Sequence, residues 1–180
     1  MKILEKYYPN GYADSVFAID YEKLYEMGYR GIIFDIDNTL VHHGDDSTDE
    51  VDELFRRIHS TGLKTILLTN NDEERVRRFI RNIDTPFICD ADKPNIKGYL
   101  KAVSELGIKR SEAVVIGDQI FTDIIGAKNS GIAGVLVRFI KLPEEKWIGK
   151  RRCIEKLILW SWRRKGRCGE IGDIYLQKRD

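Results

Sequence analysis

The chain has 180 residues, of which 42% are hydrophobic and 33% are charged. This size and composition are typical of one soluble globular domain and exclude a disordered chain. Three scattered cysteines are too few for a disulfide framework or a cysteine-based zinc site. No apolar run approaches the roughly 20 residues of a membrane span, and the segment "MKILEKYYPNG" has no signal-peptide core. We therefore expect a reduced, cytoplasmic protein.

The formal net charge of +1 hides an uneven distribution of charge along the chain. Residues 138–180 contain 13 Lys and Arg against 6 Asp and Glu, whereas the first 137 residues contain 17 against 23. The sequence thus predicts an acidic domain, residues 1–140, and a basic, Trp-containing C-terminal appendage, residues 141–180.

Five short apolar segments alternate with segments of helical pattern. They are "GIIFDID", "KTILLTNN", "PFICDADK", "EAVVIGD" and "GVLVRF". Such runs are typical of strands that are covered on both faces. The helices between them have start signals: Ser47 with Glu50, Asn71 with Glu74, and Asn95. A fourth helix is expected over residues 122–128.

Five strands joined by four helical crossovers predict an α/β fold. The expected architecture is a doubly wound, Rossmann-like, three-layer domain with a five-stranded, mainly parallel sheet. Ligands of such sheets bind beyond the carboxyl ends of the strands, at the point where the strand order reverses. A functional site is therefore expected at that edge.

Polar residues follow the predicted strands at this edge. They are Asp35 and Asp37 after the first strand, Thr69 and Asn70 after the second, Lys93 after the third, and Asp118 with Asp123 after the fourth. Four neighbouring carboxylates raise one another's pKa and need a compensating cation. Oxygen ligands of this type suit Mg²⁺, which in turn attracts a phosphate group.

The other residues at this edge suit phosphoryl transfer. Thr69 and the amide of Asn70 can donate hydrogen bonds to a phosphoryl oxygen, and Lys93 supplies a positive charge. Asp35 is the candidate nucleophile that forms an aspartyl-phosphate. Asp37 is the candidate general acid and base.

Four segments, "FDIDNTL", "ILLTNN", "DKP" and "GDQIFTD", resemble in order and spacing the motifs of haloacid dehalogenase-like phosphatases. The resemblance implies that Asp35 attacks and binds Mg²⁺, that Asp37 handles protons and binds the metal through its carbonyl, and that Asp118 is a direct ligand with Asp123 in support. Thr69 and Lys93 would bind the phosphoryl group. The segment before Asp35 resembles the YqeG-like, class IIIA branch, which is similar to phosphatidylglycerophosphate phosphatases.

The spacing between the motifs indicates a site without a cap domain. Asp37 and Thr69 are 32 positions apart, and Thr69 and Lys93 are 24 apart, which leaves no room for an inserted domain of about 50 residues. An open site suits a large phosphorylated substrate, including a lipid headgroup, unless a neighbouring subunit of a homo-oligomer provides a lid.

The expected function is Mg²⁺-dependent hydrolysis of a phosphomonoester, with phosphatidylglycerophosphate of phospholipid synthesis as the leading substrate. Two alternatives stay open: a soluble sugar-phosphate or nucleotide phosphatase, and a non-enzymatic, phospho-accepting signalling or scaffold domain. The second resembles receiver domains, but in those the lysine follows the fifth strand, and here Lys93 follows the third.

The basic tail and one loop have more than one interpretation. Ile154, Leu157, Ile158 and Trp162 share a helical face beside basic residues. Residues 147–167 therefore suit peripheral contact with an anionic membrane, at its inner face, or packing against the domain. No nucleic-acid motif is present. His42 and His43, after the nucleophile, either contact substrate or lie in a solvated turn.

Overall fold

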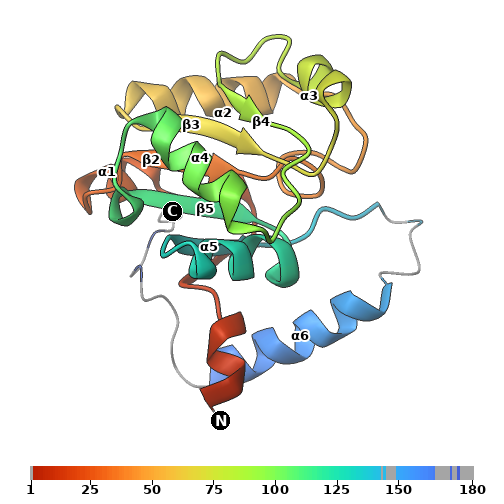
Figure 1. Ribbon diagram of the computed structural model, residues 1–180. Helices are drawn as coiled ribbons and strands as arrows, with labels where there is room; N and C mark the ends of the chain where they lie inside the picture. Colours follow the sequence, from red (N-terminus) through yellow and green to blue (C-terminus); the bar gives the residue numbers. More distant parts are fainter. Residues whose placement is uncertain (1, 143, 145–148, 165–170, 172–173, 175–180) are drawn as a thin grey trace, which may run out of the picture.

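The computed structural model describes residues 2–142, 144, 149–164, 171 and 174. Six parallel strands form one sheet, in the order β1-β6-β5-β2-β3-β4 (Figure 1). The strands are β1 (Gly11–Ala13), β2 (Gly31–Phe34), β3 (Lys64–Leu68), β4 (Phe87–Ile88), β5 (Ala113–Gly117) and β6 (Ala133–Val137). The chain runs from β2 outward to β4 and then returns to β5 on the other side of β2. The strand order therefore reverses between β2 and β5.

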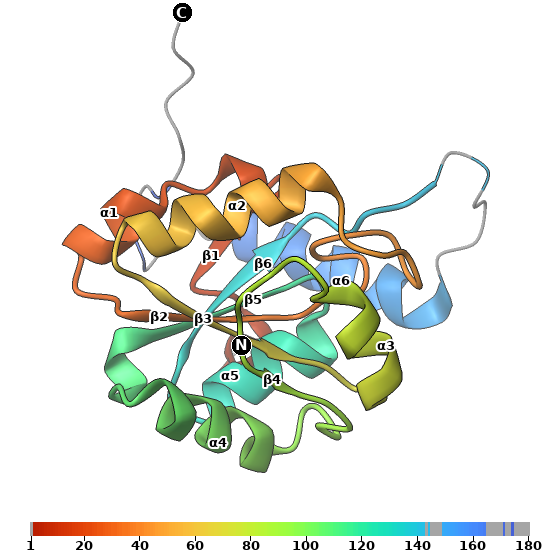
Figure 2. The same cartoon turned by 90° about the horizontal axis from the view of Figure 1, so that it is seen from above.

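Helices cover both faces of the sheet (Figure 2). They are α1 (Tyr21–Glu26), α2 (Asp49–Ser60), α3 (Glu73–Phe79), α4 (Ile96–Leu106), α5 (Ile125–Asn129) and α6 (Gly149–Arg164). Alternate strand residues point to opposite faces. Ile32 and Phe34 pack with α1, α2 and α3 in one buried cluster, whereas Ile33 packs with α4 and α5 in another. Burial on both faces explains why the strands are apolar throughout.

The doubly wound, three-layer α/β fold is confirmed, but the sheet has six strands rather than five. The additional strand, β1, pairs in parallel with β6 at the edge of the sheet. It has only three residues, Gly11–Ala13, too short to give a strand pattern in the sequence. The division into a domain of residues 1–140 and an appendage of residues 141–180 stays a prediction.

Two predicted helix starts were wrong by one residue. The N-cap of α2 is Thr48, not Ser47, and the N-cap of α3 is Asp72, not Asn71. In both helices the cap side chain accepts a hydrogen bond from the backbone N–H three residues later. The predicted start of α4 at Asn95 is confirmed. The predicted fourth helix is divided into a π-helical turn, Ile120–Ile124, and α5.

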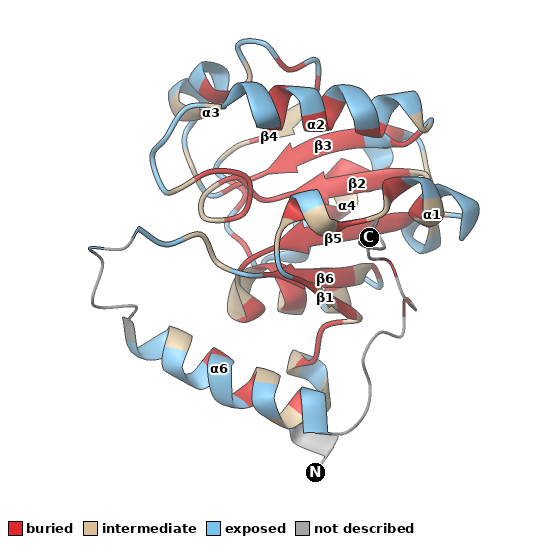
Figure 3. Ribbon diagram, turned by 180° about the vertical axis from the view of Figure 1, so that it is seen from behind, coloured by how far each residue is buried: buried red, intermediate tan, exposed pale blue. Residues whose placement is uncertain are grey.

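Helix α6 lies beside the β1–β6 edge of the sheet and has both buried and exposed positions (Figure 3). Ile158 and Trp162 are buried against Tyr8, Ile120 and other residues of a third apolar cluster. Of the four residues predicted to share a helical face, Ile158 and Trp162 are therefore buried, whereas Ile154 and Leu157 are exposed, as is Trp160. Residues 147, 148 and 165–167 of the predicted membrane-contact segment, like Cys168, lie outside the described residues.

Candidate active site

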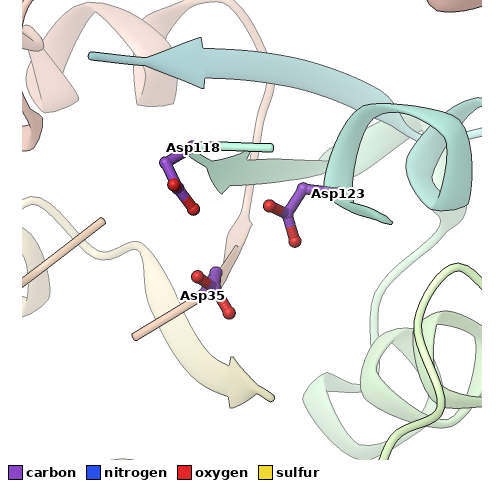
Figure 4. A group of neighbouring side chains, drawn as sticks. All are labelled: Asp35, Asp118 and Asp123. Atoms are coloured by element: carbon purple, nitrogen blue, oxygen red, sulfur yellow. The ribbon is translucent and has the colours of Figure 1, made fainter. Parts of the chain in front are cut away.

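The reversal point between β2 and β5 brings the predicted site residues together. Phe34 of β2 lies opposite Ile116 of β5, so Asp35 and Asp118 follow these neighbouring parallel strands at the same edge of the sheet. Asp123 follows in the π-helical turn after β5. Carboxylate oxygens of Asp35, Asp118 and Asp123 lie within 4.8 Å of one another, and all three residues are buried (Figure 4). We call these three residues the carboxylate cluster.

A glycine allows the last of these residues to approach closely. A Cβ atom on Gly117, the final residue of β5, would lie 2.4 Å from the carboxyl carbon of Asp123. Any larger side chain would therefore push Asp123 away from Asp35 and Asp118. The backbone N–H of Gln119 donates to Oδ2 of Asp123 at 3.0 Å and fixes its orientation further.

Two side chains connect the members of the carboxylate cluster. The buried Nζ of Lys93 donates to Oδ1 of Asp35 at 2.5 Å and to Oδ1 of Asp123 at 2.7 Å. The hydroxyl of Thr39 lies 3.2 Å from both Oδ2 of Asp35 and Oδ1 of Asp118. Asp35 therefore presents one oxygen to the lysine and the other towards Asp118.

Burial and neighbouring carboxylates raise the pKa of two carboxyl groups in the cluster. Burial, and after it the charges of Asp123 and Asp37, outweigh the opposing effect of Lys93 and raise the pKa of Asp35 to about 6. Burial and the neighbouring Asp35 raise the pKa of Asp118 to about 8, although Arg152 opposes this. Burial alone would lower the pKa of Lys93, but Asp123 and Asp35 raise it above its ordinary value. Lys93 is thus held as a cation.

The donor set of the cluster fits a small divalent cation. Its ligand atoms are carboxylate oxygens, which hard cations such as Mg²⁺ prefer. Oxygens that share such an ion lie about 3–4 Å apart, so groups within 4.8 Å need only small side-chain movements. Oδ2 of Asp35 and Oδ1 of Asp118 face each other across the Thr39 hydroxyl. A divalent cation there would offset the repulsion that raises their pKa values.

The side chain of Asp37 lies outside the carboxylate cluster, so the expectation of four neighbouring carboxylates is correct for three. Its oxygens accept hydrogen bonds from the Asn71 side chain at 2.7 Å, the Gly44 N–H at 3.1 Å and Arg75 at 3.1 Å. The imidazole of His43 lies 3.2 Å away. Burial alone would raise the pKa of Asp37, but the Asn71 and Gly44 hydrogen bonds, followed by the charges of Arg75 and His43, lower it.

The predicted phosphate-binding residues follow β3 and β4. Thr69 is buried at the end of β3, and its hydroxyl accepts a hydrogen bond from the N–H of Asn71 at 3.2 Å. The side-chain oxygen of Asn70 accepts a hydrogen bond from the N–H of Lys93 at 2.7 Å. Asn70 thus ties the loop after β3 to the loop that carries Lys93.

Helix α6 supplies two further residues to the site. A guanidinium nitrogen of Arg152 donates to Oδ2 of Asp118, and another donates to the Asp118 carbonyl at 2.7 Å. Glu155 pairs with Arg152 at 3.1 Å and accepts the backbone N–H groups of Ile120, at 2.8 Å, and Phe121, at 3.3 Å. The helix therefore holds both the Asp118 side chain and the turn that leads to Asp123.

Sequence reasoning missed several of these contacts for different reasons. Thr39 lies within the same segment as Asp35 and Asp37, so its position was a usable signal. Arg75 and Asn71 follow β3 but carry no distinctive pattern. Arg152 is 34 residues after Asp118, inside a run of basic residues. Only the packing of α6 against the domain distinguishes Arg152 from its neighbours.

Comparisons with known proteins agree with this geometry. Residues 43–131 match the family model of the haloacid dehalogenase-like hydrolases. The chain is 35% identical over 166 residues to the probable phosphatase YqeG of Bacillus subtilis, covering 91% of this chain and 96% of that protein. The chain belongs to the haloacid dehalogenase-like hydrolases and is a phosphatase.

Two other similarities are more distant. The chain is 26% identical over 159 residues to phosphatidylglycerophosphate phosphatase 1 of Arabidopsis thaliana, covering 82% of this chain but only 46% of that protein. The crystal structure of an uncharacterized protein from Listeria monocytogenes has a TM-score of 0.53 at 17% identity, covering 73% of this chain and 97% of that one. The second similarity shows the fold alone. The predicted membership of a haloacid dehalogenase-like, YqeG-like phosphatase family is confirmed.

Proposed function

We propose that this phosphatase hydrolyses a phosphomonoester with Mg²⁺ through a phosphorylated Asp35. The observation that carries the proposal is the position of the Asp35 carboxylate, which has Lys93 on one oxygen and faces Asp118 with the other. The oxygen beside Lys93 is the candidate to attack phosphorus, since the lysine offsets charge on the phosphoryl group there. The other oxygen is the candidate metal ligand.

Asp35, Asp118 and the Asp37 carbonyl would hold Mg²⁺, with Asp123 in support. When bound, the cation would neutralise charge on the carboxylates and on the phosphoryl oxygens. Both oxygens of Asp123 already accept hydrogen bonds, from Lys93 and from the Gln119 N–H, which suits a supporting role. The hydroxyl of Thr69 and the backbone N–H of Asn70 would donate to the phosphoryl group.

Asp37 would transfer protons on either side of the phosphorylated intermediate. It first gives a proton to the departing alcohol and then takes one from the water that attacks phosphorus. The hydrogen bonds around Asp37 lower its pKa, so the resting side chain is in the form that activates water. A phosphate dianion bound nearby raises the pKa of a carboxyl group, which favours the proton-donating form before the first step.

Phosphatidylglycerophosphate is the proposed substrate. Support comes from the similarity to a plant phosphatidylglycerophosphate phosphatase and from the exposed apolar side chains of α6. A soluble sugar phosphate or nucleotide is the alternative substrate class. The non-enzymatic, phospho-accepting alternative does not fit membership of a phosphatase family, and no observation favours it.

Peripheral contact with an anionic membrane is part of this proposal. Ile154, Leu157 and Trp160 are 50%, 67% and 58% exposed and recur every three residues along α6. Lys and Arg residues flank them, which suits the surface of a membrane with acidic lipids. None of the helices in the described part of the chain is long and apolar enough to cross a membrane. A cytoplasmic location, the absence of nucleic-acid binding and a homo-oligomer that completes the site stay predictions.

The first test measures phosphate release from an aryl phosphate with and without Mg²⁺. We expect hydrolysis that needs Mg²⁺ and that disappears in Asp35→Asn. An inactive wild-type protein, or a fully active Asp35→Asn variant, contradicts the proposed chemistry. The second test compares phosphatidylglycerophosphate in vesicles with a panel of soluble phosphates, and a strong preference for a soluble phosphate contradicts the lipid substrate.

The membrane contact is best tested by substitution rather than truncation, because removing α6 also removes the Arg152–Asp118 contact. We expect the triple change of Ile154, Leu157 and Trp160 to Ser to reduce binding to vesicles of acidic lipid. A matched triple change of exposed polar residues on α2, Glu53→Ser, Arg56→Ser and Ser60→Ala, controls for surface substitution. Unchanged vesicle binding of the α6 variant contradicts the membrane role.

A further inference from the structure

Between the end of β6 and helix α6 lies a pocket of about 310 Å³. We call it the α6 pocket. Tyr12 of β1 and Phe139 after β6 form part of one side, and α6 forms the other. Pockets that hold small ligands begin at about this volume.

The α6 pocket and the carboxylate cluster share one residue. Asp118 lines the pocket and also belongs to the cluster. Arg152 lines the pocket too and holds Oδ2 of Asp118. The pocket therefore lies beside the place where a phosphomonoester at Asp35 would carry its alcohol part.

One face of α6 presents its polar and apolar side chains to the pocket. Arg152, Lys156, Leu159 and Arg163 all line it, and their spacing of four, three and four residues places them on the same side of a helix. The guanidinium carbon of Arg152 lies over the Phe139 ring, 4.6 Å from its centroid, and that of Arg163 over the Tyr12 ring, 4.7 Å from its centroid. A stacked guanidinium keeps its in-plane N–H groups available to oxygen acceptors.

The pocket has more positive charge than its own carboxylates offset. Four basic residues line it: Arg138, Arg152, Lys156 and Arg163. Arg152 is paired with Asp118 and Glu155, and Arg138 with Asp14. Within residues 2–142, 144 and 149–164, neither Lys156 nor Arg163 forms an ion pair with a carboxylate. Two cations therefore lie at a pocket that also has apolar walls.

We propose that the α6 pocket binds a second phosphate group, in particular a phosphodiester, carried by the alcohol part of the substrate. This inference rests on the proposed function, since it concerns the same active site. Lys156 and Arg163 bind the second anion, because charge-assisted hydrogen bonds to phosphate are strong. Tyr12, Phe139 and Leu159 contact the carbon atoms between the two phosphate groups. The pocket thus selects substrates with two anionic groups over simple phosphomonoesters.

The test compares two soluble substrates that differ in the second anion. Glycerophosphoglycerophosphate carries a phosphodiester on its alcohol part, and glycerol 3-phosphate does not. We expect the wild-type protein to prefer the first in kcat/KM. In the double variant Lys156→Gln, Arg163→Gln we expect this preference to fall by about 10- to 100-fold, mainly through KM, since each charged hydrogen bond is worth about one factor of ten.

A matched double variant controls for the loss of two charges from the same helix. Lys150→Gln, Arg151→Gln removes two exposed basic residues of α6 that do not line the pocket. We expect its preference between the two substrates to stay close to that of wild type. An equal loss of preference in both double variants, or none in the Lys156/Arg163 variant, overturns the proposal. Thermal unfolding shows whether each variant is folded.

A binding measurement separates failure of this inference from failure of the proposed function. Glycerophosphoglycerol, which has the phosphodiester but no phosphomonoester, is titrated into the full-length protein by calorimetry. We expect binding that weakens at least tenfold in the Lys156/Arg163 variant, whether or not the protein hydrolyses either substrate. Equal affinity in wild type and variant, or no binding to wild type, overturns the subsite.

A further arm distinguishes a lipid source of the phosphodiester from a water-soluble one. Phosphatidylglycerophosphate in vesicles and its deacylated form carry the same two phosphate groups. If the Lys156/Arg163 variant has a lower kcat/KM than wild type with both forms, the subsite binds the headgroup whichever source supplies it. An unchanged kcat/KM of the variant with both forms overturns the subsite.

Discussion

Asp35 and Asp37 are separated by one residue but lie in opposite electrostatic surroundings. Asp35 is buried beside two other carboxylates, and its pKa is raised to about 6. Asp37 is surrounded by hydrogen-bond donors and cationic groups, and its pKa is lowered. The difference teaches that one strand end can place two carboxyl groups in environments that shift their pKa values in opposite directions, as the proposed division into nucleophile and general acid and base requires. The predictions below test this division.

The largest effect is expected for Asp35→Asn. Loss of a nucleophile typically lowers kcat by about 10⁴-fold or more, so hydrolysis of an aryl phosphate should become undetectable. Asp92→Asn is a matched control, since Asp92 is exposed and its backbone has φ of 51°, which Asn tolerates. If Asp35→Asn keeps more than a tenth of wild-type activity, Asp35 is not the nucleophile.

Asp37→Asn is expected to lower the rate of hydrolysis less than Asp35→Asn and to affect a different step. Loss of a general acid and base lowers rates by about 10²–10⁴-fold, while Asp35 can still be phosphorylated by a substrate with a good leaving group. The phosphorylated protein should therefore accumulate, and intact-protein mass spectrometry after rapid quenching measures it. Absence of a phosphorylated species, with activity lost as completely as in Asp35→Asn, contradicts separate tasks for the two residues.

Loss of the contact between α6 and Asp118 is expected to have an intermediate effect on metal affinity and activity. Arg152→Ala removes the hydrogen bonds to Asp118, and residues that orient a metal ligand typically contribute about 10- to 100-fold in metal affinity or activity. Calorimetric titration with Mn²⁺ as a probe measures the affinity directly. Arg152→Lys should restore part of it. Equal affinity in wild type and Arg152→Ala would show that the helix does not position Asp118.

The smallest expected effect is that of pH on the thermal stability of the protein. The pKa values of Asp35, about 6, and Asp118, about 8, exceed the value of about 4 in an unfolded chain. The folded state then binds more protons between about pH 4 and pH 8, so the free energy of unfolding falls as pH rises through this window. Without divalent cations, Tm should drop by several degrees over that range, at about 2–4 °C per kcal/mol.

Scanning calorimetry in the presence of a chelator and with excess Mg²⁺ measures this dependence. Mg²⁺ binds the ionised carboxylates and should raise Tm most at the upper end of the window. Asp118→Asn should flatten the dependence of Tm on pH, because the variant lacks one of the two titrating groups. A Tm that rises with pH in the chelated wild-type protein contradicts the raised pKa values.

The sequence predicted those parts of the fold and site that local pattern determines. Apolar runs that end in polar residues located β2, β3 and β5, and strand ends in a parallel sheet converge, so Asp35, Thr69 and Asp118 were placed near one another. The separation of Asp37 from the cluster was not predictable in this way. It depends on the Gly44 N–H of the same loop, on Asn71 of the loop after β3 and on Arg75 of α3.

The remaining parts depend on contacts between distant segments. β1 has three residues and is a strand because β6 lies beside it, not because of its own sequence. Thr48 caps α2 in place of Ser47, which instead donates its hydroxyl to Asp52. Arg152 and Glu155 are ordinary members of a basic helix until α6 packs through Ile158 and Trp162. Periodicity and motif spacing contain no information on that packing.

The contact between Arg152 and Asp118 also has a consequence for how the protein is made. Ribosomes synthesise a chain from its N-terminus to its C-terminus. The six strands that the structure describes are therefore complete at residue 137, before Arg152 has been added. A sheet that forms at that moment contains Asp118 without its guanidinium partner. The contact between Arg152 and Asp118 therefore cannot form until α6 has been synthesised, and a chain that ends shortly after β6 contains the four motifs without the side chain that holds Asp118.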